Sequence, residues 1–304
     1  MSFSKRKINL TFQLSSNAGT FSDGSSDTVS LTGLRVSCVI HHGGISLNYS
    51  QADLRIYGMT LSTMNRLSLL GKQIAQVAAG GDQRIPNRLT ISVGDEDNGV
   101  SACFVGIINQ AWVDMENAPD GSFIISAFTT LIDGIKPVAP TSYNGVISVS
   151  TLVSGICAQM DTPHALENNG VTGTISYPYL AGTLRQQLAE VQRTAHIEMA
   201  IDDLNNVVAI WPKGSSRNKP YKLFNKDTGL VGYPTYNQNG IQATVLFDPT
   251  IIYGAPIKIE SILTPATGTW TIYDVTHDLE SETPGGKWFT TLQCSLNSKN
   301  LPVI

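Results

Sequence analysis

The sequence has little charge, and neither sign is in large excess. Asp, Glu, Lys and Arg make up 14% of the 304 residues, and the formal net charge is −4. Nucleic acid is held by clustered positive charge against its phosphates, so this balance predicts no specific nucleic-acid binding. Hydrophobic residues still reach 41%, enough for substantial buried cores. A weakly charged surface rich in Ser, Thr and Asn is typical of a β-protein with large areas committed to partners.

Long apolar runs are also missing. No segment approaches the roughly 20 apolar residues that cross a bilayer, so no membrane anchor is expected. The basic start Lys5-Arg6-Lys7 is followed by the alternating segment 8–14, whereas a signal peptide has a continuous apolar run there. We therefore expect a protein that stays in the cytosol or leaves it without a signal sequence.

Cysteine is scarce and shows no paired spacing. The four cysteines are Cys38, Cys103, Cys157 and Cys294, and no two of them form a CxxC motif. Cys38 and Cys103 alternate with apolar neighbours at the period of a strand's buried face. Free thiols in the core are therefore expected, rather than disulfides or metal ligands.

Motifs of catalysis and cofactor binding are missing too, since the chain contains no GxSxG, Walker, GxGxxG or HExxH pattern. The adjacent His41 and His42 end a strand and point to opposite faces, so they cannot easily share a metal. His164 lies in a loop and His196 at the end of a helix, where structural roles are expected. We predict that the protein is not an enzyme and has no catalytic, cofactor-binding or metal-binding residues.

Carboxylate pairs need no local motif, so glycoside cleavage has to be weighed separately. Asp202-Asp203 is the most suggestive pair, but it occupies a turn between two strands, where Asp is common. The densest polar group is His277, Asp278, Glu280 and Glu282, which could suggest a metal site or an acid/base pair. Strand-like segments flank this group and a Pro-Gly-Gly turn follows it. We interpret it as a polar, acidic hairpin loop, in which replacing His277 and Glu280 by Ala leaves folding nearly intact.

Most of the chain reads as strands. Alternating segments bounded by turn formers lie at 8–14, 29–41, 45–58, 88–94, 102–115, 122–130, 197–201, 206–211, 240–247, 256–263, 269–277 and 287–295. Helical periodicity occurs at 151–160 and 182–196, and a short helix is predicted behind an N-cap at Thr60. The segment 15–28 is a polar loop, and 213–220 is a basic, polar linker.

Two parts of the chain repeat each other. The segment 105–128 overlays on 270–293 without a gap, and both read as long strand, acidic loop, Pro-x-Gly turn and long strand. The shared length and turn predict a duplicated hairpin, with Phe123 and Trp288 at equivalent, equally buried positions. At the place of His277 the first copy has a tryptophan, so the candidate ligands belong to one copy only.

Three stretches together resemble one family. They are "STLVSGICAQM" (150–160) and the segments 177–214 and 229–261, and the closing "YDVTHDLESETPGGKW" adds to them. They are similar to the baseplate hub of contractile-tailed bacteriophages, above all to Mu-like and related myophage hubs. The likeness covers about 150–296, and its motifs are turns and strand patterns rather than reactive groups.

The resemblance implies a mainly β (α+β) fold with two tail-tube-like antiparallel β-barrels from an internal duplication. The expected domains are a first barrel at 1–145, a small α/β domain with two helices at 146–215 and a second barrel at 216–304. Three subunits would present six barrels, a pseudo-sixfold ring that adapts the sixfold tail tube to a trimeric spike and leaves a channel for DNA. Implied partners are the trimeric tail spike, the tail tube or tube-initiator protein, the C-terminus of the tape-measure protein and baseplate wedge proteins. The implied location is the virion baseplate, assembled in the host cytoplasm.

Two alternatives stay open. The first is another tail component on the same barrel, such as a distal tail or tube-initiator protein, which would form rings of six subunits instead of three. The second is a carbohydrate-binding or hydrolytic β-protein.

Overall fold

The computed structural model describes residues 4–14, 20–21, 26–43, 50–68 and 87–296. The described chain is mainly β with few helices, as predicted. Its contacts divide it into two units, one of 1–41, 50–131 and 277–288 and the other of 42–49, 132–276 and 289–304. Parts of two predicted segments, the loop 15–28 and the strand 45–58, lie outside the described residues.

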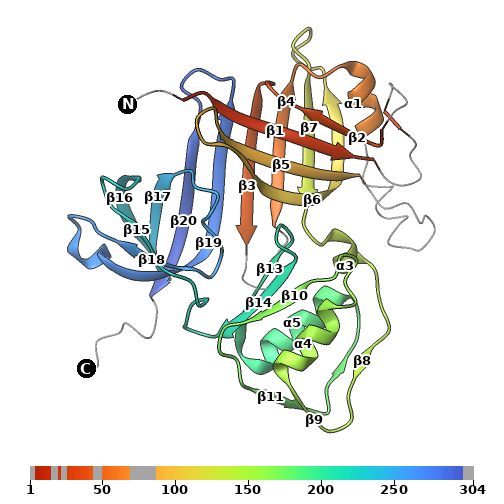
Figure 1. Ribbon diagram of the computed structural model, residues 1–304, viewed down its shortest axis with the longest axis vertical. Helices are drawn as coiled ribbons and strands as arrows, with labels where there is room; N and C mark the ends of the chain where they lie inside the picture. Colours follow the sequence, from red (N-terminus) through yellow and green to blue (C-terminus); the bar gives the residue numbers. More distant parts are fainter. Residues whose placement is uncertain (1–3, 15–19, 22–25, 44–49, 69–86, 297–304) are drawn as a thin grey trace. The chain divides into compact units, whose positions relative to one another are not determined.

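The described part of the first unit is an antiparallel sheet with the helix α1 beside it (Figure 1). Its elements are β1 (Arg6–Gln13), β2 (Thr28–Leu31), β3 (Val36–Gly43), β4 (Gln51–Tyr57), α1 (Leu61–Leu67), β5 (Arg88–Asp95), β6 (Gly99–Asp114) and β7 (Ser122–Phe128). Outward from β3 the order is β3-β4-β7-β6-β5-β1-β2, with each neighbouring pair antiparallel. Strand β2 is therefore an edge, and no closure into a barrel is observed among the described strands.

Alternation places the core of the first unit. Ile8, Leu10 and Phe12 on β1 are 2, 1 and 0% exposed, as expected when every second side chain of a strand faces inward. The single predicted strand 29–41 is in fact two, because the chain turns at Gly33 with φ +69°. The predicted short helix is confirmed as α1, in which the amide of Thr63 donates to the hydroxyl of its N-cap Thr60 at 3.3 Å.

The second unit begins with a segment built around two helices. Its elements are α3 (Leu131–Ile135), β8 (Thr141–Ser142), β9 (Val146–Ser148), α4 (Val149–Cys157), β10 (Ala165–Asn168), β11 (Thr174–Ser176), β12 (Tyr179–Leu180), α5 (Leu184–Ala195), β13 (Ile197–Asp202) and β14 (Val207–Pro212). The two predicted helices are confirmed as α4 and α5. A capping box between Thr183 and Gln186 starts α5, and His196 ends it in the left-handed conformation.

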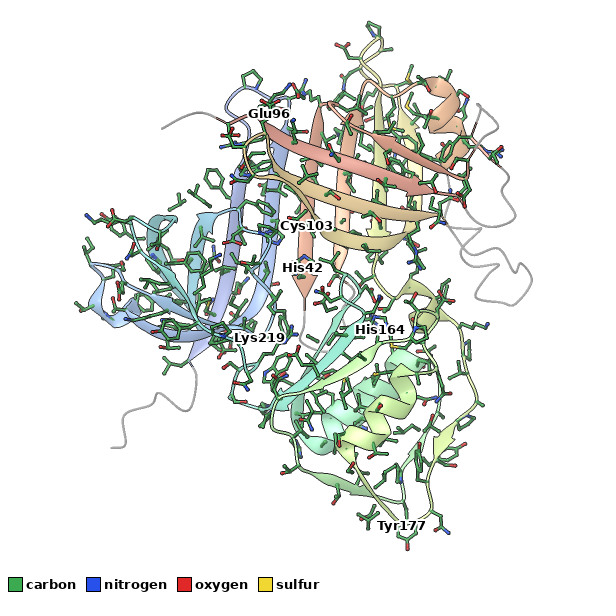
Figure 2. All side chains as sticks on the ribbon, in the orientation of Figure 1. His42, Glu96, Cys103, His164, Tyr177 and Lys219 are labelled. Carbon is green, nitrogen blue, oxygen red and sulfur yellow. The ribbon has the colours of Figure 1, made fainter. Side chains whose placement is uncertain are left out.

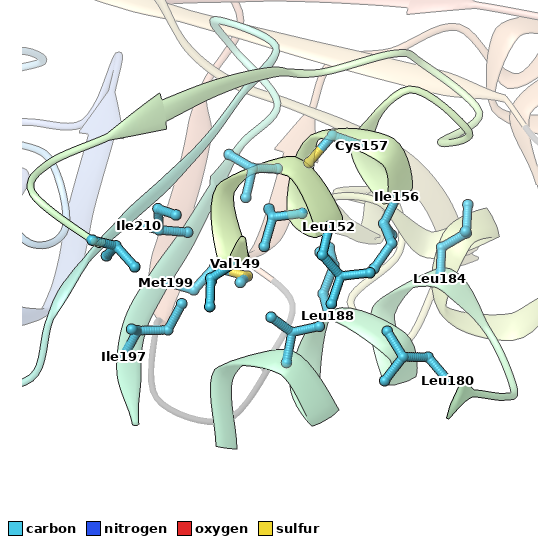
Figure 3. Close-up of a cluster of buried hydrophobic side chains, with 14 of the residues drawn as sticks. Val149, Leu152, Ile156, Cys157, Leu180, Leu184, Leu188, Ile197, Met199 and Ile210 are labelled. Carbon is cyan, nitrogen blue, oxygen red and sulfur yellow. The ribbon is translucent and has the colours of Figure 1, made fainter. Parts of the chain in front are cut away.

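The two helices share one core with the three-stranded sheet β10-β14-β13 (Figure 3). Leu152 and Ile156 on α4 meet Leu188 and Val191 on α5, and Ile210 closes the cluster from β14; all five are 0% exposed. This core explains why spacings of three and four residues identified both helices in the sequence. None of the described helices is both long and apolar enough to span a membrane.

The rest of the second unit is again a sheet. Its elements are β15 (Lys222–Phe224), β16 (Leu230–Asn237), β17 (Gly240–Leu246), β18 (Pro256–Ile259), a 3-10 turn η2 (Thr264–Ala266), β19 (Gly268–Ser281) and β20 (Trp288–Leu296). Residues 277–281 of β19 and Trp288 of β20 belong to the first unit. The order is β16-β17-β20-β19, with β18 beside β19 and β15 parallel to β18. The edge strand β16 was not predicted, because Gly232 and Pro234 interrupt its alternation.

Candidate functional site

The predicted acidic loop around His277 is wrong for most of its length. Strand β19 continues to Ser281, and its buried positions alternate through His277 (1% exposed), Leu279 and Ser281. Asp278 lies on the other face and accepts a 2.7 Å bond from the ammonium of Lys287 across the hairpin. The strand period of two therefore persists through this polar stretch, and His277 belongs to the interior of the first unit.

The neighbour of His277 in that unit is Cys103 on β6, whose sulfur lies within 4.8 Å of a ring nitrogen of the histidine. Burial raises the pKa of the Cys103 thiol to about 12. A thiol with such a pKa stays protonated at neutral pH, which makes it a poor nucleophile. All four cysteines are free and buried, as predicted.

His164 is the most constrained histidine of the second unit. Its side chain is 1% exposed; Nδ1 lies 2.6 Å from the carbonyl oxygen of Thr162 and Nε2 lies 2.7 Å from Oδ1 of Asp203. A carbonyl and a carboxylate can only accept, so this geometry favours a proton on each ring nitrogen, which is the charged form of the imidazole. Burial lowers the pKa of His164, but bonding to Asp203 and its charge outweigh burial and raise it overall.

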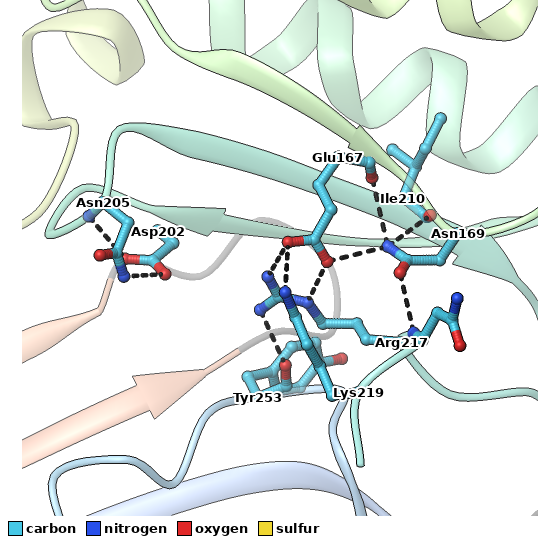
Figure 4. Close-up of polar contacts among 9 residues, drawn as sticks. Glu167, Asn169, Asp202, Asn205, Ile210, Arg217, Lys219 and Tyr253 are labelled. Atoms are coloured by element: carbon cyan, nitrogen blue, oxygen red, sulfur yellow. Dashed lines mark hydrogen bonds and ion pairs between the residues drawn. The ribbon is translucent and has the colours of Figure 1, made fainter.

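The suggestive pair Asp202-Asp203 does not act together. Asp202 accepts 3.1 and 2.8 Å bonds from the amide and side chain of Asn205, which shape the turn between β13 and β14 (Figure 4). Asp203 turns to His164 instead. Both nitrogens of that histidine are engaged, so neither can take a proton from a substrate without breaking a buried bond.

A second ionic group centres on Glu167 of β10 (Figure 4). Arg217 donates to both of its carboxylate oxygens, at 3.0 and 2.9 Å, and Lys219 adds a third bond at 3.0 Å. The hydrogen bond from Arg217 is the main reason that the pKa of Glu167 falls to about 2. The basic linker 213–220 is therefore only partly solvated, since the side chain of Arg217 is 4% exposed.

Arg217 also joins the helical part of the second unit to its last sheet. Its amide donates to the carbonyl of Gly254 at 2.8 Å, just after Tyr253, whose ring packs on Trp211 with centroids 5.7 Å apart. Gly254 has φ +79°, and a Cβ there would lie 2.6 Å from the ring of Trp211. Only glycine fits this close approach. Sequence reasoning missed this joint because Glu167 and Arg217 are far apart in the chain.

The exposed large apolar side chains of the second unit fall mainly in two groups. Tyr143, Val146, Tyr177 and Tyr179 lie on or beside β8, β9, β11 and β12. Val231, Tyr233, Tyr236 and Leu246 lie on β16 and β17. Tyrosine is enriched at protein interfaces, so these groups are the candidate binding surfaces of the unit. In the sequence, these surfaces could have been found as tyrosines that lie within long uncharged runs.

Comparison with known proteins gives one family. Residues 8–294 match a family model described as "Baseplate hub gp41". No curated protein matches the sequence.

Several solved structures share the fold. The 43 kDa tail protein of prophage MuSo2 from Shewanella oneidensis matches with a TM-score of 0.60 and 9% identity, over 96% of this chain and 97% of that one. A tail protein from Neisseria meningitidis MC58 matches with a TM-score of 0.59 and 8% identity, over 94% of this chain and 96% of that one. A third match is an E. coli component of the type VI secretion system, described as structurally similar to the T4 tail proteins gp27 and gp5. Its TM-score is 0.58 and its identity 9%, over 88% of this chain and 74% of that one. At these identities the likeness concerns the fold.

Proposed function

This chain belongs to the baseplate hub gp41 family, and we propose that it is the structural hub of a contractile phage tail. The family match over residues 8–294 is the observation that carries the proposal. The end-to-end likeness to a prophage tail protein supports it, because almost no part of either chain is left over. The proposed role is structural, with no catalytic, cofactor-binding or metal-binding residues.

The proposed domains are 1–145, 146–215 and 216–304, with a tube-like barrel at each end of the chain. The hairpins β6–β7 and β19–β20 partly support a duplication. In their second strands two of the paired positions are buried alike, Ile125 with Thr290 and Ala127 with Leu292, whereas Phe123 is more buried than its counterpart Trp288. Their first strands differ, because a register shift between Ile108 and Gln110 in β6 changes which face points inward.

In this proposal three copies form a ring of six barrels between a sixfold tube and a trimeric spike, with a central channel for DNA. The neighbours would be the tail spike, the tube or tube-initiator protein, the tape-measure C-terminus and wedge proteins. The site would be the virion baseplate, after assembly in the host cytoplasm. The joint around Arg217 suits this role, since a ring under load needs its domains held at fixed angles.

The decisive experiment is a reconstruction of the assembled tail, with the copies in each ring counted. Three copies per ring are expected for a hub. A ring of six would instead identify a distal tail or tube-initiator protein. Purified protein is also expected to release no product from peptidoglycan, and cleavage there would favour the hydrolytic alternative.

A further inference from the structure

The end of strand β6 has an open side. β5 pairs with β6 only as far as Ile107, and β7 pairs with it from Ile107 to Asp114. Figure 2 labels Cys103, which lies in the half of β6 that β5 covers. Beyond that half, at residues 110–114, none of the described strands pairs with the side of β6 opposite β7. The main-chain groups of an open strand side are a template for another strand.

The same side of β19 is covered within the chain. β18 pairs with β19 only from Gly268 to Thr271, and the next strand on the side opposite β20 is β3. Residues 277–281 of β19 belong with most of β3 to the first unit, where the hydroxyl of Ser281 donates to the carbonyl of Leu34 at 3.1 Å. The end of β19 therefore lies beside the start of β3.

The strands around the two hairpins have the same order. In the first unit the order is β3-β4-β7-β6-β5, and in the last sheet it is β16-β17-β20-β19-β18. Each set is also consecutive along the chain, from β3 to β7 and from β16 to β20. By this order β16 corresponds to β3 and β19 corresponds to β6. β17 is the one partner of β16 among the described strands, so the counterpart of β3 has an open side as well.

The two open sides carry no charge that would keep another strand away. Residues 99–113 and 228–247 contain no Asp, Glu, Lys, Arg or His, although lysine is a common guard of exposed strand edges. Large apolar side chains are exposed at both places, with Trp112 on β6 at 37% and Val231 on β16 at 36%. Both edges therefore suit a partner that pairs through its main chain.

We propose that the open side of β6 pairs with the start of β16 in a second copy of this chain. The contact repeats between two copies what β19 and β3 form within one copy. Because the end of β19 lies beside the start of β3, the end of β6 is expected beside Leu230 and Val231, before Pro234 interrupts β16. Main-chain hydrogen bonds hold an added strand, so the pairing tolerates the different side chains of the two hairpins.

Each copy offers one open side of each kind. The contact joins two different surfaces, so it repeats from copy to copy and closes into a ring when the rotation allows it. Such a ring would contain two hairpins per copy, joined alternately within and between chains. Closure after three copies rests on the hub function proposed above.

The test uses the full-length chain with a lysine placed on either edge. Trp112→Lys alters the end of β6, and Val231→Lys alters the start of β16. Val100→Lys is the matched control for β6, because Val100 is 39% exposed and lies in the half that β5 covers. Leu204→Lys is the control for β16, since Leu204 is 36% exposed and lies in the turn between β13 and β14.

Self-association is measured by sedimentation velocity and native mass spectrometry over a concentration series. Wild type and both controls are expected to associate alike, whereas each edge variant loses at least about tenfold in affinity, because a lysine on the edge opposes pairing. All four variants should melt within about 2 °C of wild type, since they change exposed positions. A wild type that stays monomeric would overturn the inference, and so would equal losses in the edge variants and the controls.

Mixing the two edge variants tests whether the two edges meet. Trp112→Lys keeps an intact β16 and Val231→Lys keeps an intact end of β6, so the mixture should form a one-to-one dimer although each variant alone is monomeric. A mixture that stays monomeric would contradict the pairing. Binding of a different tail protein at β6 by a monomeric wild type would identify another occupant and overturn the inference.

Chemical cross-linking locates the contact directly. The four native thiols are buried, so a short bismaleimide should react with engineered cysteines. Trp112→Cys mixed with Val231→Cys should give a linked dimer on a denaturing gel, and Val100→Cys mixed with Val231→Cys should not. Equal linking in both mixtures, or in neither, would contradict the contact.

Reconstruction of the tail separates this inference from the hub function. A three-copy ring whose contacts avoid β6 and β16 would overturn the inference and leave the hub function standing. A six-copy ring joined through β6 and β16 would overturn the hub function and leave the strand pairing standing.

Discussion

Two histidines show how single residues take their roles from the atoms around them. His164 faces two oxygens that can only accept, so its position between Thr162 and Asp203 favours the charged imidazolium form. His277 occupies an inward position of β19 with the sulfur of Cys103 beside its ring. Both histidines are polar residues, and both are buried inside the fold rather than exposed at a reactive site.

The charge on His164 predicts that stability falls as pH rises. Because its folded pKa is raised, the stabilisation is complete below the unfolded pKa near 6.5 and is lost as pH rises through the higher folded value. Asp133 also faces the cluster, and its charge adds to the raised pKa of His164. Urea midpoints of the wild type should therefore decrease between about pH 6 and about pH 9.

The control for this effect is Asp203→Asn, which removes the charge that holds the proton on His164. It should cost about 3 kcal/mol near pH 6 and flatten the pH profile, as breaking a buried pair does. A wild-type midpoint that rises over the same range would contradict the assignment.

His277 and Glu280 should behave differently, although they are three residues apart on one strand. His277→Ala removes a buried side chain and should cost about 2 to 4 kcal/mol in the free energy of unfolding. Glu280→Ala, on the solvated face, should cost about 0.5 kcal/mol or less. Equal, small effects in denaturant titrations would restore the loop interpretation.

At the scale of elements, alternation and helical spacing were enough to place most strands and both long helices. Local pattern failed where polar residues kept the strand period, as at His277, or where Gly232 and Pro234 broke it, as in β16. It also could not pair Glu167 with Arg217, because that contact depends on the tertiary fold. The character of the surfaces was predictable from low charge, but the positions of the tyrosines on them were not.

The two hairpins give a direct comparison of equivalent positions. Phe123 is 0% exposed, whereas Trp288 is only partly buried and has the guanidinium of Arg6 5.4 Å from its ring centroid. Phe123→Ala should therefore cost about 3 to 5 kcal/mol, and Trp288→Ala roughly half as much. This replaces the equal costs expected from the repeat. Chemical denaturation of both variants measures these two costs. A larger loss of stability in Trp288→Ala than in Phe123→Ala would contradict the difference in burial between the two side chains.

The ionic joint predicts an acid-sensitive connection between elements. With its folded pKa near 2, ionised Glu167 contributes stability that is present above the unfolded pKa of 4.5 and lost as pH falls through about 2. The shift corresponds to about 3 kcal/mol, which Glu167→Gln should remove along with the acid dependence. Lys219→Met is the matched control; this more exposed partner should cost about 0.5 kcal/mol. A variant at Glu167 with the wild-type acid profile would refute the role of the joint.

For the whole molecule, the weak charge is consistent with the DNA channel proposed above, because it leaves few cations to hold a polyanion. Twenty basic and 24 acidic side chains leave no net positive field. Several basic groups are already paired with carboxylates, as in Lys5 with Glu282 and Lys7 with Glu96. The surface should therefore offer few cations to phosphates.

The ring proposed above is expected to show no measurable DNA binding at about 0.15 M salt, because each neutralised phosphate would add affinity and slow the proposed passage of DNA. Fluorescence anisotropy with labelled duplex DNA is the measurement. Micromolar, salt-dependent binding that disappears when channel-facing lysines or arginines are neutralised would contradict the passage model.

The free thiols have a consequence for the lifetime of the particle. All four are buried, and burial raises their pKa values, to about 12 for Cys103 and Cys157. Oxidants attack the exposed thiolate form, so these sulfurs are protected in air as well as in a reducing cell. In a tail built from this chain, these cysteines would not form disulfides after the particle leaves its host for an oxidising environment. Because all four native thiols are buried, one engineered surface cysteine would react selectively with a label.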